Sequence, residues 1–247
     1  MNFDYNETMN VIHEPSASSP FLVISKPAGI PSAPLFEGDE SLLTQAIRLF
    51  PEIKNVCGKK SVEHGLIHRI DTETSGLLLI ATSQESYDAL LKAQKDDKFE
   101  KFYRAGIEKI PDCAGILGGF PPLPDAFSGT ETKISAESSF RTFGKGGKEV
   151  RPVTQEAGRA ALKKGGNRLY KTEIVFESEK TALCHITAGF RHQVRCHLAW
   201  CGFPVHGDKI YNPKARNLSS ENHDMKFCAC KIIFPHPLTG LPQVFET

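Results

Sequence analysis

A carboxylate with a cation beside it is the first feature of the sequence that could perform chemistry. Asp71 lies in a polar loop shortly after His68 and Arg69, and the apolar run GLLLIAT follows at residues 76–82. A carboxylate that a cation keeps ionised, on a loop anchored by a buried strand, suits catalysis. The same residues also suit a structural role, in which Asp71 forms a turn or caps residues 72–75.

An aromatic side chain lies on the next expected strand. In KFYRAGI, at residues 101–107, alternation places Tyr103 on one face with Ala105 and Ile107. A tyrosine in this setting is usually a core residue whose hydroxyl is satisfied at the rim. Its ring could instead stack on a nucleobase.

Histidines and cysteines cluster in the expected helix at residues 192–200. His192 and Cys196 are four residues apart, as are His197 and Cys201, which is an offset that paired metal ligands use on one helix face. The two pairs are offset by five residues and point about 140° apart on a helix. We therefore expect no metal site here. A zinc site would need further ligands such as His64, His68 or His206.

Positive charge gathers in one part of a chain that is otherwise almost neutral. The protein has 30 Lys and Arg against 29 Asp and Glu, so a polyanionic partner would have to meet a local patch. Residues 140–171 hold nine bases against Glu149 and Glu156. Their interleaved glycines would let the segment lie along the phosphates of such a partner, with Lys145, Lys148 and Arg151 in contact with them. A solvated surface is the alternative.

The composition excludes several classes of protein. Of 247 residues, 40% are hydrophobic and 24% charged, which sets aside disordered, collagen-like and coiled-coil chains. No apolar run approaches the roughly 18 residues of a membrane span, and the N-terminus lacks the cations of a secretion signal. Seven cysteines without a C-x-x-C pair fit reduced thiols. We expect a cytoplasmic monomer with no membrane contact and no obligate protein partner.

The elements that must position these residues do not alternate regularly. We expect residues 1–20 to be poorly ordered or extended and residues 21–247 to form one catalytic domain. Strands outnumber helices, which favours an α+β domain with a large mixed, mostly antiparallel sheet flanked by helices and loops. The expected strands are 21–25, 76–82, 101–107, 170–177, 181–188 and 230–234, the expected helices are 41–50, 84–99 and 192–200, and 111–165 holds hairpins and long loops.

These features, in this order, resemble the RluA-type family of RNA pseudouridine synthases from Phe21 to Phe245. FLVISKPAGIPSAP resembles the family's opening strand and K-P-x-G loop, HRIDTETSGLLLIA its H-R-[LI]-D-x-x-T-S-G-[LV] motif, and KFYRAGI its K-x-Y-x-A segment. HQVRCHLAWCGFPVHGDKIY resembles its H-Q-[IL]-R block, which extends to G-D-x-x-Y, and FPHPLTG the closing turn. Two such specific blocks at the proper separation very rarely arise by chance.

The resemblance implies that a uridine already in rRNA or tRNA is converted to pseudouridine without cofactor or metal. Cleavage of the bond to C1′ develops oxocarbenium-like charge that a carboxylate stabilises or traps. Asp71 matches the family's catalytic aspartate, Arg195 the arginine that pairs with it, and Tyr103 the tyrosine that stacks on the uracil. The uridine must be flipped out of its helix, and Arg69 would contact the RNA that the base has left. His68 would support the loop.

Two departures from the family pattern stand out. Phe190 stands at the position of the arginine in the family's G-R-x-H-Q pattern. A cation, Arg191, follows one place later beside His192. We count Arg191, His192 and His68 with the substrate-binding residues. Cys228 stands where many members have histidine.

The RNA-binding surface is expected to lie on the catalytic domain itself, because we expect no S4 domain ahead of residue 21. Two alternatives stay open from the sequence. One is a non-catalytic RNA-binding protein on the same fold, which the departure at Phe190 raises. The other is a zinc enzyme built on the histidine and cysteine cluster.

Overall fold

The computed structural model describes residues 9–123, 132–216 and 224–247. The chain forms two compact units: unit 1 comprises Met1–Phe102 and Cys228–Thr247, and unit 2 comprises Tyr103–Phe227. The chain passes between them inside strands β4 (Glu100–Gly106) and β9 (Phe227–Pro235). Because strands carry these crossings, no linker-like composition marks them in the sequence.

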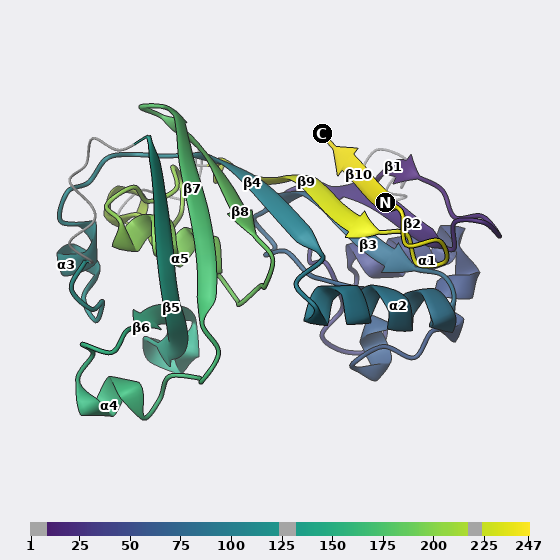
Figure 1. The fold of residues 1–247 in the computed structure, drawn as a ribbon, viewed down its shortest axis with the longest axis horizontal. Coiled ribbons are helices and arrows are strands. Elements are labelled where there is room, and N and C mark those ends of the chain that lie inside the picture. The colour runs from purple at the N-terminus through teal and green to yellow at the C-terminus, as the bar shows by residue number, and fades with distance from the viewer. Residues whose placement is uncertain (1–8, 124–131, 217–223) are drawn as a thin grey trace. The chain divides into compact units, whose positions relative to one another are not determined.

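Unit 1 contains strands that are buried on both faces. The residues of β3 are buried from Gly76 to Ala81, which explains the unbroken run GLLLIA. The strand β2 pairs antiparallel with β1 and β3, β9 pairs parallel with β3, and β10 pairs antiparallel with β9 (Figure 1). The bounds are β1 (Asn10–His13), β2 (Phe21–Lys26), β3 (Ser75–Ala81) and β10 (Pro242–Glu246).

Strand β1 lies within residues 1–20, the segment that the sequence predicted to be poorly ordered or extended. Asn10 pairs with Ser25 and Val11 with Ile24. The strand has only four residues and none of them is buried, so its side chains give little periodic signal. Main-chain pairing to β2 therefore defines it.

The helices of unit 1 begin at sequence signals. Helix α1 (Leu42–Leu49) starts at Ser41, which forms a reciprocal capping box with Thr44, and the α-helix ends ahead of Pro51. Helix α2 (Gln84–Lys95) starts at Ser83, packs against β3, and ends before Asp97, whose φ is +55°. Short 3₁₀ turns follow α1 at Pro51–Asn55 and Ser61–Glu63.

Unit 2 holds an antiparallel sheet and the helix that carries Arg195. The strand β5 pairs with β6 and β7, and β7 pairs with β8. Every residue of helix α5 (Gln193–Trp200) is buried, and the helix packs against β6 and β7. The other bounds are β5 (Lys133–Phe143), β6 (Glu149–Val153), β7 (Tyr170–Ser178), β8 (Thr181–Ile186), α3 (Cys113–Leu117), α4 (Arg159–Leu162) and α6 (Pro213–Arg216), with a 3₁₀ turn at Lys145–Gly147.

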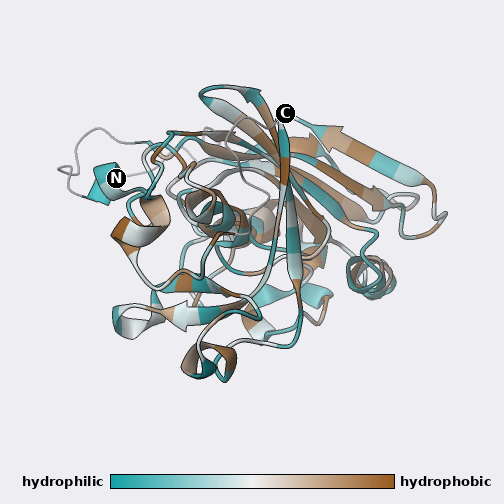
Figure 2. Cartoon of the chain, turned by 60° about the vertical axis from the view of Figure 1, so that its left-hand side comes forward, coloured by the Kyte–Doolittle hydropathy of each residue, from teal (hydrophilic) through white to brown (hydrophobic). Residues whose placement is uncertain are grey.

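The predicted fold class is confirmed: the fold is α+β with a large, mostly antiparallel sheet. The hydrophobic stretches lie largely along the strands (Figure 2). Within the described ranges, no helix has the length and hydrophobicity that crossing a bilayer requires.

Candidate functional site

The loop that carries Asp71 is held in unit 1 by its own backbone and by β3. The Thr74 amide donates to the Asp71 carbonyl at 3.0 Å, which is the turn that the sequence allowed. Gly76, the second residue of β3, has φ +114°, and a Cβ there would lie 2.3 Å from the Ala229 carbonyl oxygen on β9. Only glycine fits so close an approach. The loop therefore leaves the sheet at a defined point.

A buried lysine ties this loop to the K-P-x-G loop. The Lys26 ammonium is 1% exposed and donates to the carbonyl oxygens of Pro27 (2.9 Å), Ile30 (2.7 Å) and Thr72 (2.9 Å). The Gly29 amide donates to the Thr72 carbonyl at 2.8 Å. Burial lowers the pKa of Lys26 to about 8, although the charges of Glu73 and Asp71 act in the opposite direction. This amine is a structural tie beside Asp71.

Ser32 supplies a second tie between the two loops. Its buried hydroxyl donates to the Ile70 carbonyl at 2.7 Å and accepts from the Ile70 amide at 3.2 Å. Ile70 directly precedes Asp71, so the backbone is fixed on both sides of the carboxylate. Neither Lys26 nor Ser32 was predicted as a site residue. Lys26 is the last residue of β2 and directly follows the expected strand 21–25, so its sequence position carries only a weak signal of burial.

His68 is buried and uncharged. Its Nε2 accepts from the Leu79 amide at 3.3 Å, and its ring meets Phe99 edge to face at 5.0 Å. Burial, helped by the charge of Lys101, lowers its pKa to about 3. This geometry agrees with support of the loop. Arg69, in contrast, is exposed and pairs with Glu63 at 2.9 Å, a surface ion pair that costs little to exchange for another anion.

Arg195 is held in unit 2 by Asp208. Its Nε and Nη2 donate to the two carboxylate oxygens at 2.7 and 2.8 Å, and the side chains are 4% and 0% exposed. Asp208 also accepts from the amides of Ile210 and Tyr211 at 2.8 and 3.1 Å. The guanidinium carbon lies 5.4 Å from the centre of the Tyr211 ring. A bidentate fork of this kind fixes direction as well as position.

Asp208 is a residue that the sequence reasoning missed. It stands in the G-D-x-x-Y part of the second block, but only Asp71 was predicted as the partner of Arg195. The two carboxylates do not exclude each other as partners, because Asp208 engages Nε and Nη2 and a guanidinium has five N–H donors. Asp71 belongs to unit 1, and Arg195 and Asp208 belong to unit 2.

Tyr103 is backed by a second aromatic ring within unit 2. The ring of Phe227 lies 5.1 Å from that of Tyr103, with 10° between the planes. Tyr103 is 8% exposed. Phe227 therefore covers one face of the tyrosine, and the two rings form a flat, rigid pair.

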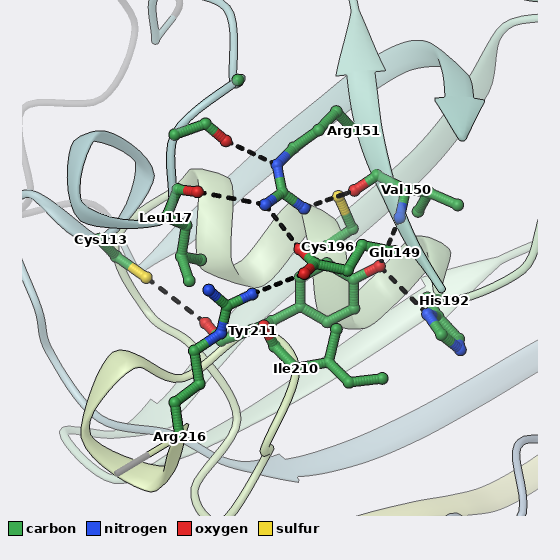
Figure 3. Close-up of polar contacts among 12 residues, drawn as sticks. Cys113, Leu117, Glu149, Val150, Arg151, His192, Cys196, Ile210, Tyr211 and Arg216 are labelled. Atoms are coloured by element: carbon green, nitrogen blue, oxygen red, sulfur yellow. Dashed lines mark hydrogen bonds and ion pairs between the residues drawn. The ribbon is translucent and has the colours of Figure 1, made fainter. Parts of the chain in front are cut away.

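A network around Tyr211 fixes the start of α5 (Figure 3). His192 precedes the helix in a left-handed conformation, φ +56°, and its Nδ1 lies 3.1 Å from the Tyr211 hydroxyl. That hydroxyl also accepts from the Val150 amide at 2.9 Å, and burial raises the pKa of Tyr211. Exposed Arg191 donates to the carbonyls of Gly147 and Glu149. His192 and Arg191 thus join α5 to the β5–β6 hairpin.

Arg151 does not lie on the surface, and its predicted contact with RNA is wrong. The guanidinium is 0% exposed, donates to the carbonyls of Gly118, Val150 and Leu117, and pairs with Glu149 at 2.7 Å (Figure 3). A charge count over the basic segment treats every cation as exposed, and this one is used inside unit 2. Lys145 and Lys148 are exposed at the β5–β6 turn, where an RNA contact stays a prediction.

Phe190, the departure from the family pattern, is part of an aromatic cluster. Its ring stacks on Phe140 at 5.0 Å with 5° between the planes, and tilts against Tyr170 at 5.3 Å. Its amide donates to the Gln193 side chain at 2.9 Å. A hydrophobic residue at this position therefore serves packing beneath the start of α5.

The histidine and cysteine cluster has structural partners. Both ring nitrogens of His197 lie near hydroxyls, Ser138 at 3.0 Å and Thr172 at 2.8 Å, and burial lowers its pKa to about 3. Burial raises the pKa of the Cys196 and Cys201 thiols. Within the described residues, no three His, Cys, Asp or Glu side chains are placed to hold a metal ion. These contacts give the zinc hypothesis no support.

Comparison with known proteins identifies the family. Residues 20–200 match the family described as RNA pseudouridylate synthase. An uncharacterized RNA pseudouridine synthase of Mycoplasma pneumoniae is 29% identical over 98% of this chain and 67% of its own length. The ribosomal large subunit pseudouridine synthase D of Zymomonas mobilis is 24% identical over 91% and 65%, and the tRNA pseudouridine(31) synthase of Saccharomyces cerevisiae 25% over 82% and 46%.

A solved structure agrees in fold. The human RNA pseudouridylate synthase domain containing 1 superposes with a TM-score of 0.67 at 17% identity, covering 100% of this chain and 86% of the other. The family match covers most of the chain, and the fold of the human protein extends over all of it. The chain belongs to the RNA pseudouridylate synthase family and is an RluA-type RNA pseudouridine synthase.

Proposed function

We propose that this enzyme converts specific uridines of structured rRNA or tRNA to pseudouridine after extruding the nucleoside, with Asp71 as the catalytic carboxylate. The observation that carries the proposal is the fixation of the Asp71 loop. Buried Lys26 and Ser32 hold the backbone on both sides of this residue. A carboxylate in a fixed place can meet the charge that develops at C1′ when the glycosidic bond breaks.

Arg195 would pair with Asp71 during the reaction. Asp208 engages one edge of the guanidinium and thereby aims it. A cation near Asp71 would keep the carboxylate ionised and oriented. In this proposal Asp208 does not touch the substrate and acts as a positioning residue through Arg195.

Tyr103 would stack on the extruded uracil. Phe227 packs against its ring and holds the ring plane in a fixed orientation. Stacking on an aromatic side chain is worth about 1–3 kcal/mol per base. This gain offsets part of the few kcal/mol that unstacking the uridine costs.

The RNA contacts proposed outside the reacting nucleoside are exposed cations. Arg69, Lys145 and Lys148 are exposed and can reach phosphates. His68 and His192 would hold the site in shape, because each is engaged with a neighbouring group. The seven free cysteines fit a reducing compartment, and we propose a cytoplasmic monomer that acts on RNA without a cofactor.

A pseudouridine map tests the proposal. Carbodiimide-dependent reverse-transcription stops are compared in cells with and without the gene, over all rRNA and tRNA. At least one stop is expected to disappear on deletion and to return with the wild-type gene. Identical stops in both strains would contradict the proposal, and tight RNA retention without any modification would favour the non-catalytic binding protein instead.

A further inference from the structure

Unit 2 contains a hollow that the proposed reaction does not use. Its volume is about 380 Å³. We propose that this basic hollow binds one phosphate group of the RNA backbone and so anchors RNA away from the reacting uridine, an inference that rests on the proposed function. It is lined by Arg141, Gly158, Arg159, Ala160, Ala161 and Lys164.

The lining is unusual in its charge. Of the six described residues that line it, three are cations and none is an acid or an aromatic residue. Like charges held near one another repel, and a bound anion relieves that cost. The guanidinium fork matches phosphate oxygens bidentately, while glycine and alanine let a ligand approach the backbone. None of the described lining residues offers a stacking surface to a base, whereas the three cations can meet a phosphate group.

Arg141 is pre-positioned for such a ligand. Its Nη2 donates to the Gly119 carbonyl at 3.0 Å, and its guanidinium carbon lies 5.0 Å from the centre of the Phe143 ring. Holding the side chain in the unbound protein reduces the rotamer entropy that binding would otherwise cost. The hollow therefore has one fixed cation.

Arg159 and Lys164 are the two lining cations whose side chains can change rotamer to meet a ligand. Both are exposed, and neither forms an ion pair with another residue in the described part of the chain. The turns of α4 fix their backbone, since the Lys163 amide donates to the Arg159 carbonyl and the Lys164 amide to the Ala161 carbonyl. Two mobile side chains on a fixed turn can close on a phosphate that Arg141 already holds.

A matched pair of substitutions tests the hollow. The probe is a fluorescein-labelled oligouridylate, whose binding is followed by fluorescence anisotropy at several salt concentrations. Lys164→Gln and Arg159→Gln are each expected to weaken binding about tenfold, the loss of one charge-assisted contact. Lys163→Gln removes the same charge from the neighbouring exposed residue outside the lining and is expected to leave affinity within twofold.

Salt dependence shows whether the cations share one phosphate. For single-stranded nucleic acid, each neutralised phosphate contributes about 0.7 to the slope of log affinity against log salt. The triple variant Arg141→Gln, Arg159→Gln, Lys164→Gln is expected to lose about 0.7 in total. A loss near three times that value, or an equal effect of Lys163→Gln, means a diffuse basic surface and overturns the proposal. An unchanged urea midpoint shows that the variants fold.

Two further arms separate the ligand source from the activity. Inorganic phosphate and the dinucleotide UpU are titrated against the labelled RNA. Competition by UpU at lower concentration than phosphate supports an RNA anchor, whereas competition by inorganic phosphate or an acidic peptide alone overturns it. Pseudouridine formation by the wild type is measured in the same preparations. A wild type that modifies RNA while the hollow variants bind normally refutes only the hollow, and an inactive wild type refutes only the proposed function.

Discussion

Replacement of Asp208 by asparagine perturbs the most deeply buried ion pair described in unit 2. The substitution keeps the shape and one acceptor oxygen but removes the charge that faces Arg195. Removal of one partner from a buried pair costs about 3–5 kcal/mol, because the remaining charge stays in a low-dielectric interior. Because one acceptor oxygen is retained, the loss of stability in Asp208→Asn is expected at the lower end of this range, near 3 kcal/mol. With a urea dependence of about 2 kcal/mol per molar, the unfolding midpoint falls by about 1.5 M.

Trp200 provides the signal for this measurement. It is the single tryptophan of the chain, is 0% exposed, and lies on α5 one turn after Arg195. Its fluorescence during urea unfolding therefore reports the unit that holds the ion pair. In the same preparations without urea, pseudouridine formation is expected to fall because Arg195 is no longer aimed.

Glu177→Gln is the matched control in the same unit. It makes the same chemical change in the exposed pair of Glu177 with Arg104, at 3.4 Å, where solvent screens the charges. No measurable loss of stability is expected. The reasoning is refuted if Asp208→Asn unfolds at the wild-type midpoint, since the Arg195 guanidinium would then not depend on this carboxylate.

Three further results follow from buried cations and histidines. Lys26→Met is expected to lower the free energy of unfolding by about 1–3 kcal/mol, because three carbonyls lose their donor. The pKa of Lys26 is about 8 in the folded protein and 10.5 in the unfolded chain, so between pH 8 and 10.5 the free energy of unfolding of the wild type should rise relative to that of the variant in urea titrations. His197 has a pKa of about 3 when folded against 6.5 unfolded, so stability should fall as pH falls below 6.5, and less steeply in His197→Gln. Arg151→Ala should lower the urea midpoint, whereas Lys148→Ala should leave it unchanged and weaken RNA binding in filter assays; equal midpoints for these two variants would contradict the burial argument.

The sequence predicted what short-range patterns encode. An unbroken apolar run gives β3, and a serine cap starts α1. Two specific motifs match Asp71 and Arg195 to the family's catalytic positions, and these two roles stay predictions. These features depend on residues close together in the chain. The family resemblance and the fold class follow from them.

The remaining features depend on which residues the fold brings together. Asp208 lies thirteen residues after Arg195, and only the turn that returns the chain to α5 makes it the partner. Arg151 is buried because carbonyls of the segment around Leu117 reach it, although its neighbours in the sequence suggested a surface. Lys26 finds an acceptor 46 residues away. The sequence gives the charge of each residue but not the distance between residues that folding brings together.

The most direct test of the central claim asks whether a variant altered at Asp71 can restore pseudouridine formation in cells that lack the gene. Cells lacking the gene receive the wild type, Asp71→Asn or Glu73→Gln, an exposed acid two residues later in the same loop, at equal protein levels. Carbodiimide mapping is then repeated at the sites that the deletion erased. We predict full restoration by the wild type and by Glu73→Gln, and none by Asp71→Asn, whose urea midpoint, followed by circular dichroism of the whole chain, stays near that of the wild type. Restoration by a folded Asp71→Asn protein would contradict the account.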